Sequence, residues 1–168
     1  MNLNKLNRKK NRFENYNYSQ SGWYFVTICV KNKEKFFGEI KNNEMILNEC
    51  GKIIKNQWLW LKKQFCYIQL DEYVIMPNHI HGILVITNDN GMDKSRPVPT
   101  KKIKSLSELI GAFKTTSSKL IHKNELENFQ WQRSFYDHII RNEKSLNNIR
   151  EYIDNNPLKW TMDRNNIY

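Results

Sequence analysis

Residues 73–86 read Tyr-Val-Ile-Met-Pro-Asn-His-Ile-His-Gly-Ile-Leu-Val-Ile, two apolar stretches that meet at Pro77. Because β-branched and aromatic residues dominate both stretches, the sequence predicts two strands joined by a tight connection. His79 and His81 are two residues apart, and side chains at i and i+2 of a strand lie on the same face. Neutral imidazole is the commonest metal ligand in proteins, so the pair predicts half of a divalent-metal site.

The segments around this stretch predict an antiparallel sheet covered by helices. Strands are expected at residues 23–30, 66–76 and 79–86, in a hairpin over 36–47 that turns at Asn42-Asn43, and within 129–140. Apolar residues at helical spacing predict helices over 49–65, 105–123 and about 143–155, the last stopped by Pro157. This order is typical of an α+β sandwich of the ferredoxin-like (RRM-like) type, with the strand of His79 in a central position.

Length and charge suggest one domain with a polyanionic partner. The 168 residues, 39% of them hydrophobic, suit a single domain over 21–160, with a basic arm over 1–20 and a short tail over 161–168. A formal net charge of +10 favours nucleic acid over an anionic membrane as partner. The basic residues in the arm and in a loop over 87–104 are candidates for phosphate contacts: Arg8, Lys9, Lys10, Arg12, Lys94, Arg96, Lys101, Lys102 and Lys104. The ordinary alternative is a solvated basic surface.

The remaining composition argues against several other classes. Three widely spaced cysteines in apolar surroundings predict neither a disulfide framework nor a cysteine zinc cluster. The basic N-terminus lacks the apolar region of a signal peptide, and no stretch approaches the roughly 18 apolar residues that span a bilayer. We therefore expect a cytoplasmic protein without a membrane partner.

The predicted C-terminal helix carries Tyr152 and Asn156 four residues apart, on a face next to its apolar one. If this face lies over the histidines, the amide oxygen of Asn156 completes the metal site and the Tyr152 hydroxyl points at the bound group. Such a set suits attack on a phosphodiester, because a cation stabilises the phosphoryl charge and tyrosine supplies a covalent nucleophile. Other interpretations stay open: Tyr152 as a packing residue, Asn156 as a helix C-cap, and Tyr136 beside His138 as the nucleophile.

Three segments also match one known family in their residues and their order. They are residues 73–82 (Tyr-Val-Ile-Met-Pro-Asn-His-Ile-His-Gly), 131–141 (Trp-Gln-Arg-Ser-Phe-Tyr-Asp-His-Ile-Ile-Arg) and 151–157 (Glu-Tyr-Ile-Asp-Asn-Asn-Pro). Together they resemble the single-tyrosine HUH transposases of the insertion-sequence 200 (IS200) type, and among these the REP-associated tyrosine transposases. The resemblance runs from about Arg12 to Trp160 and is far more specific than a lone His-x-His.

The resemblance implies an HUH endonuclease fold and an enzyme that cleaves and rejoins single-stranded DNA. In such an enzyme His79, His81 and Asn156 bind Mg2+ or Mn2+, and Tyr152 attacks the scissile phosphate. The products are a 5′-phosphotyrosine link and a free 3′-hydroxyl. A later 3′-hydroxyl can rejoin the DNA without ATP. The family recognises imperfect hairpins of repetitive extragenic palindromes (REP) beside a single-stranded guide sequence. Further candidates for DNA contact are Trp131, Arg133, Tyr16 and Tyr18.

Two functions of other classes stay open on the sequence alone. A non-catalytic nucleic-acid-binding module of ferredoxin-like fold also uses aromatic and basic side chains, and forms no covalent adduct. A zinc hydrolase built on the histidines needs a carboxylate, for which Asp71 and Glu72 are candidates. His138 and Arg141 either position the substrate or serve the fold, and Asn78 is interpreted as a turn residue. The chain is expected to be a monomer or a homodimer.

Overall fold

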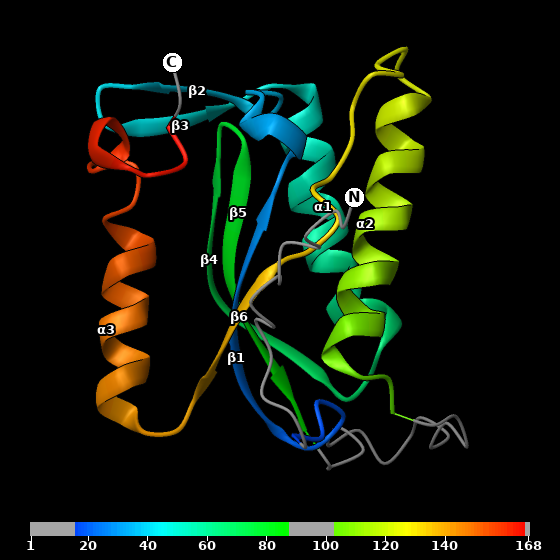
Figure 1. Cartoon of the computed structure of the whole chain (residues 1–168), viewed down its shortest axis with the longest axis vertical. Helices are drawn as coiled ribbons and strands as arrows, with labels where there is room; N and C mark the ends of the chain where they lie inside the picture. Colours follow the sequence, from blue (N-terminus) through cyan, green and yellow to red (C-terminus); the bar gives the residue numbers. More distant parts are fainter. Residues whose placement is uncertain (1–15, 88–102, 167–168) are drawn as a thin grey trace, which may run out of the picture.

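The computed structural model describes residues 16–87 and 103–166, and in this part of the chain a four-stranded antiparallel sheet forms the centre. Its strands are β1 (Gly22–Cys29), β4 (Ile68–Met76), β5 (His79–Ile86) and β6 (Tyr136–Ile140), in the order β4-β5-β1-β6. Helices α1 (Glu49–Gln64) and α2 (Leu106–His122) cover one face, and α3 (Glu143–Asp154) covers the other (Figure 1). The predicted ferredoxin-like α+β fold is confirmed.

Strand β5 is buried on both sides because helices lie on both faces of the sheet. All eight of its residues are buried. Its even-numbered apolar residues join the large core under α1 and α2, whereas Ile83 and Val85 join the smaller core under α3. Since side chains alternate along a strand, His79 and His81 face α3.

Gly82 explains how α1 approaches β5 so closely. A Cβ atom on Gly82 would lie 2.5 Å from the Trp58 ring of α1, nearer than real Cβ contacts come. The indole of Trp58 is fully buried in the large core. Glycine in the His-Ile-His-Gly motif therefore makes room for an aromatic side chain on the face opposite the histidines.

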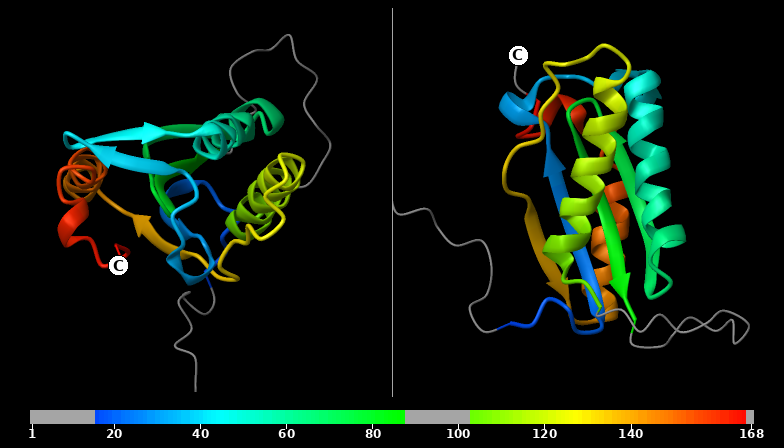
Figure 2. Two further views of the ribbon diagram at one scale, coloured as in Figure 1. Left: turned by 90° about the horizontal axis from the view of Figure 1, so that it is seen from above. Right: turned by 90° about the vertical axis from the view of Figure 1, so that its right-hand side faces the viewer.

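A small hairpin covers the end of the sheet at which β5 begins. Strands β2 (Gly38–Lys41) and β3 (Glu44–Leu47) pair antiparallel. Asn42 and Asn43 connect them with φ angles of 50° and 64°, as a type I′ turn requires, so the predicted turn is confirmed. The views in Figure 2 show the hairpin lying across this end of the sheet.

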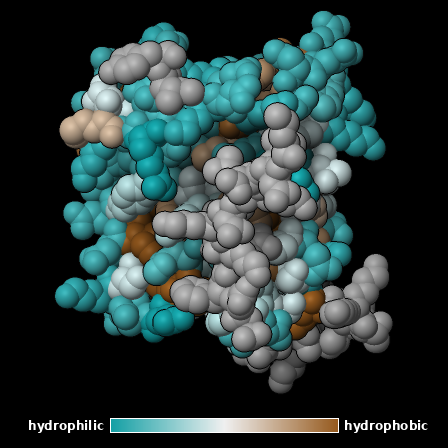
Figure 3. Space-filling view, viewed as in Figure 1, coloured by the Kyte–Doolittle hydropathy of each residue, from teal (hydrophilic) through white to brown (hydrophobic). Residues whose placement is uncertain are grey.

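The face of the molecule in Figure 3 is mostly hydrophilic, and its larger hydrophobic areas lie beside α3. Within residues 16–87 and 103–166, no helix has the length and apolar character needed to cross a bilayer.

Candidate active site

Strand β5 holds His79 and His81 side by side beneath α3. Both imidazoles are fully buried, and their Nε2 atoms lie 3.0 Å apart. In the strand register His81 is opposite Thr27 of β1, whose hydroxyl oxygen lies 2.8 Å from Nδ1 of His81. A hydroxyl can donate or accept a hydrogen bond, so Thr27 is compatible with either tautomer of His81. One of them carries the proton on Nδ1 and leaves the lone pair of Nε2 free for a metal.

Asn78 fixes the tautomer of His79. Its Nδ2 donates hydrogen bonds to the backbone oxygens of Lys33 and Asn165, at 2.7 and 2.8 Å, so its Oδ1 is left to accept. That Oδ1 lies 2.8 Å from Nδ1 of His79. Nδ1 therefore carries the proton, and the lone pair of His79 is on Nε2. The interpretation of Asn78 as a turn residue was incomplete, because this buried amide also orients a histidine.

Burial keeps both imidazoles in the neutral form that binds metals. Loss of solvent lowers the pKa of His79 to about 4, against the attraction of Asp163. The pKa of His81 falls well below its ordinary value for the same reason, and the nearby His79 adds to the effect. At neutral pH the pair thus offers two nitrogen ligands that need no deprotonation.

Helix α3 brings Tyr152 to the histidines of its own chain. The Tyr152 hydroxyl lies 3.2 Å from Nε2 of His81, and its ring packs edge-on against Phe25 of β1. The side chain is 41% exposed, so its hydroxyl can be reached from outside. Burial of the hydroxyl and the charge of Asp163 raise the pKa of Tyr152, whereas a hydrogen bond with Asn156 lowers it.

Asn156 is buried next to Tyr152 and has an unused oxygen. It is 3% exposed, and its Oδ1 has no hydrogen-bond partner among the described residues. The C-cap of α3 is Asn155, so the alternative of Asn156 as the helix cap is wrong. A buried carbonyl oxygen without a partner costs free energy, which a bound cation would recover.

These donors fit a divalent metal ion. His79 and His81 offer two nitrogens, and Asn156 offers an amide oxygen. In an octahedral ion with bonds of about 2.1 Å, adjacent ligands are about 3.0 Å apart. The separation of the two Nε2 atoms matches this distance.

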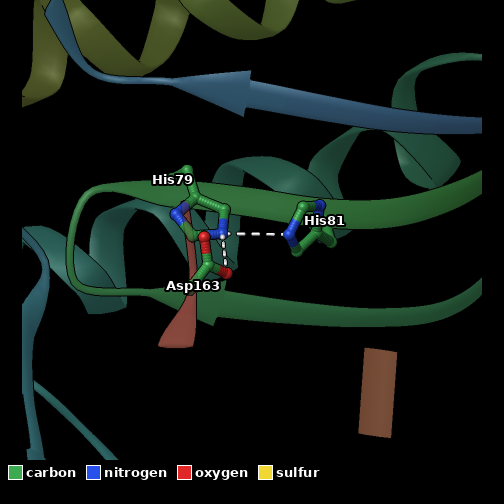
Figure 4. A group of neighbouring side chains, drawn as sticks. All are labelled: His79, His81 and Asp163. Atoms are coloured by element: carbon green, nitrogen blue, oxygen red, sulfur yellow. Dashed lines mark hydrogen bonds and ion pairs between the residues drawn. The ribbon is translucent and has the colours of Figure 1, made fainter. Parts of the chain in front are cut away.

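A carboxylate from the C-terminal segment joins the histidine pair. Oδ2 of Asp163 lies 3.9 Å from Nε2 of His79 (Figure 4). The ligand atoms of His79, His81 and Asp163 all lie within 4.8 Å of one another. No sequence signal marks Asp163 as a site residue, because residues 161–168 carry no periodicity or motif.

Arg150 anchors α3, and with it Tyr152, to the sheet. Its Nε and Nη2 donate to the two carboxylate oxygens of Asp71, at 2.8 and 2.7 Å. Asp71 sits where the register of β4 against β5 shifts, between Leu70 and Tyr73. The hydrogen bonds from Arg150 also lower the pKa of Asp71. Asp71 is therefore engaged with α3 and is not the carboxylate beside the histidines.

Trp131 has a packing role in this structure. Its ring packs against Phe37, Phe113 and Phe129, with centroids 5.3 to 5.6 Å apart. Its indole nitrogen donates a hydrogen bond of 3.0 Å to the Ser117 hydroxyl. Contact of Trp131 with DNA stays a prediction.

The other candidate residues lie outside the histidine cluster. Tyr18 is buried in the large core, so the expectation that this side chain contacts DNA is wrong for this structure. Tyr136, the alternative nucleophile, is an exposed residue of β6. Arg133, Lys104, His138 and Arg141 are exposed. Eight of the basic candidates lie outside the described residues: Arg8, Lys9, Lys10, Arg12, Lys94, Arg96, Lys101 and Lys102.

The fold and the site together define a ferredoxin-like protein with a histidine pair on a central strand and a tyrosine beside it on the covering helix. The family described as "Transposase IS200 like" has a sequence model that matches residues 18–156. The chain belongs to this family, and the prediction drawn from the three motifs is confirmed.

Three similar proteins illustrate how the chain relates to known sequences and structures. An uncharacterized protein of Haemophilus influenzae is 41% identical over 165 residues, which cover 94% of this chain and 92% of the relative. Another protein of that organism, provisionally named a REP-associated tyrosine transposase, is 27% identical and covers 84% and 73% of the two chains. A solved structure of a REP-associated tyrosine transposase bound to a REP hairpin shares the fold, with a TM-score of 0.60 and 19% identity, over 91% of this chain and 76% of the other.

Proposed function

We propose that this transposase belongs to the REP-associated group and cleaves and rejoins single-stranded DNA that carries a hairpin. One observation carries the proposal: the Tyr152 hydroxyl lies 3.2 Å from Nε2 of His81, beside the histidine pair of the same chain. The names of two similar proteins, one of them bound to a REP hairpin, support the choice of substrate.

In this proposal His79, His81 and Asn156 hold Mg2+ or Mn2+. When bound, the ion polarises a phosphoryl oxygen and offsets the negative charge that develops in the transition state. The Oδ1 atom of Asn156, which accepts no hydrogen bond within residues 16–87 and 103–166, supports its inclusion. Asn78 and Thr27 keep the two imidazoles oriented from their Nδ1 sides.

Tyr152 is the proposed nucleophile. Its raised pKa keeps the phenol protonated at rest, so attack requires loss of that proton, and the hydrogen bond with Asn156 favours the phenolate. The phenolic oxygen bonds to phosphorus as the bond from phosphorus to the 3′ oxygen breaks. The DNA then has one end linked to Tyr152 through its 5′ phosphate and one free 3′-hydroxyl. Attack of a 3′-hydroxyl on this link restores the phosphodiester and the phenol, so no ATP is needed.

A basic cavity supports a path for the DNA strand to this site. A cavity of about 680 Å³ is lined by Lys31, Lys33 and Arg133 beside Trp131. It adjoins a smaller cavity of about 220 Å³, which shares Lys33 with it and extends to Thr27. Cations along such a path favour a phosphate backbone, as does the net charge of +10.

The test is a covalent adduct. Wild-type protein incubated with Mn2+ and a labelled single-stranded REP-like hairpin should give a protein–DNA band that survives denaturant. Tyr152→Phe should abolish the band, because it removes the attacking oxygen and little else. Tyr136→Phe is the matched control, since it changes another exposed tyrosine in the same way, and should leave the band intact.

Two results would contradict the proposal. An adduct that persists in Tyr152→Phe and disappears in Tyr136→Phe would move the nucleophile to β6. Tight binding of the hairpin by wild-type protein without any adduct would favour the non-catalytic DNA-binding module.

A further inference from the structure

We propose that Asp163 is a further ligand of the divalent ion, so that the segment after α3 forms part of the active site. This inference rests on the proposed function and extends its ligand set. The side chain of Asp163 is 7% exposed, and its Oδ2 lies 3.9 Å from Nε2 of His79. Two ligands of one ion with bonds of about 2.1 Å are at most about 4.2 Å apart. The Asp163 and His79 atoms fall within this limit. The ligand atoms of His79, His81 and Asp163 together lie within 4.8 Å of one another, so a small side-chain movement brings all of them into range of one ion.

The two oxygens of Asp163 have different surroundings. Oδ1 accepts a hydrogen bond of 2.6 Å from the backbone N–H of Asn165, which is an ordinary turn interaction. Oδ2 does not take part in that bond and faces His79, as Figure 4 shows. The turn thus accounts for one oxygen and leaves the other directed at the histidine pair.

Two side chains, Asn78 and Lys33, hold the segment that follows α3 against the site. Nδ2 of Asn78 donates to the backbone oxygen of Asn165 at 2.8 Å, while Oδ1 of the same amide pairs with His79. Nζ of Lys33 donates to the backbone oxygen of Arg164 at 2.6 Å. One side chain, Asn78, therefore orients a histidine ligand and also positions the turn that holds Asp163.

Trp160 adds a packing contact at the start of this segment. It lies in the short 3-10 helix η2 (Trp160–Met162), is buried, and its ring centroid is 6.1 Å from that of His79. The contacts on both sides of Asp163 limit how far its carboxylate can move from the pair.

The charge of the site gives a reason for a carboxylate there. His79, His81 and Asn156 are neutral donors, so they leave both charges of a divalent ion uncompensated in a buried place. Lys33 and Arg164 add positive charge nearby. Mg2+ and Mn2+ prefer oxygen ligands, carboxylates above all. Asp163 supplies a hard oxygen and the missing negative charge.

The test is Mn2+ binding by the full chain without DNA. Binding is measured by titration calorimetry and by the electron paramagnetic resonance signal of the Mn2+ that stays free. Asp163→Asn should weaken binding at least about tenfold, because it removes the charge but keeps an acceptor for the N–H of Asn165. His79→Ala should also lose binding. Glu127→Gln removes one exposed carboxylate from the connection before β6 and serves as the control for net charge. Its affinity should stay close to that of wild type.

The outcomes separate this inference from the proposed function. Unchanged Mn2+ binding in Asp163→Asn, with binding lost in His79→Ala, would overturn the role of Asp163 and leave the histidine ligands intact. Tighter Mn2+ binding in Asp163→Asn would also overturn the inference, because Asp163 would then compete with the ion for the histidine pair. If Asp163→Asn does not fold, Asp163→Glu, which displaces the carboxylate, should bind Mn2+ more weakly than wild type, and equal binding would refute the inference. The Tyr152 adduct tests the proposed function separately.

Discussion

His79 is a residue that burial keeps neutral, so the metal-free protein should lose stability when it is acidified. Its pKa is about 4 in the folded chain and 6.5 in an ordinary setting. Between these values the unfolded chain binds a proton that the folded chain does not, so the free energy of unfolding falls as the pH drops below about 6.5. The loss from this residue should be on the order of 2 kcal/mol by pH 5. Denaturant unfolding in a chelator at pH 7.5 and 5.0 measures it.

His79→Gln is the control for this acid effect. Glutamine does not titrate, so the difference in unfolding free energy between the two pH values should shrink in the variant. His81 still contributes, because its pKa is lowered too, so the difference should not vanish. An equal difference in wild type and variant would mean that His79 is not the source.

Gly82 is a residue whose missing side chain matters for packing. A Cβ there would meet the Trp58 ring at 2.5 Å, and the buried indole has little room to move. Gly82→Ala should therefore lower the free energy of unfolding by about 1–3 kcal/mol. Gly111→Ala on α2 is the matched control, because its Cβ meets nothing within 4 Å, and helix propensity makes it neutral or stabilising. Equal stability of the two variants in denaturant titrations would contradict this packing argument.

At the scale of elements, the position of α3 determines where the Tyr152 hydroxyl lies. The ion pair between Arg150 and Asp71 ties this helix to β4. Arg150→Ala should slow formation of the DNA adduct roughly tenfold to a hundredfold, because a small displacement of a reacting group is costly. Mn2+ binding should change little, since Arg150 contacts none of the proposed ligands. Initial rates of adduct formation measure the effect.

The control for Arg150 has to separate helix position from charge. Lys144→Ala removes another positive charge from an exposed site on α3. Its adduct rate should stay near that of wild type, whereas Asp71→Asn should resemble Arg150→Ala. If Lys144→Ala slows the reaction as much as Arg150→Ala does, the effect comes from attraction of DNA and not from helix position.

The strands of the sheet and the helices that cover it were predictable, because apolar periodicity and capping residues are local signals in the sequence. Strand β5 begins at His79 and coincides with the apolar run of the sequence. Helix α2 begins after Ser105, whose hydroxyl accepts a hydrogen bond from the backbone N–H of Glu108, as in a capping box. The family motifs indicated His79 and Tyr152 as site residues, and the structure brings them together around His81.

The rest of the site depends on contacts that no local pattern reveals. Asp71 and Arg150 are 79 positions apart in the sequence, and they meet because α3 packs on the face of the sheet that carries the Asp71 side chain. Asp163 comes from a short segment without periodicity, and its position depends on Asn78, a residue far away in the sequence. Such contacts belong to the folded chain as a whole, so a sequence pattern could not predict them.

At the scale of the whole molecule, the structure supports a site that is complete within one chain. Tyr152 lies beside the histidines of its own sheet, and α3 follows β6 after only Arg141 and Asn142. A mixture of His79→Ala and Tyr152→Phe proteins should therefore form no more adduct than either variant alone, as measured on denaturing gels with the labelled hairpin. Each variant mixed with wild type should give adduct in proportion to the wild-type protein. Restored adduct in the mixture of variants would mean that the tyrosine of one subunit serves the histidines of another.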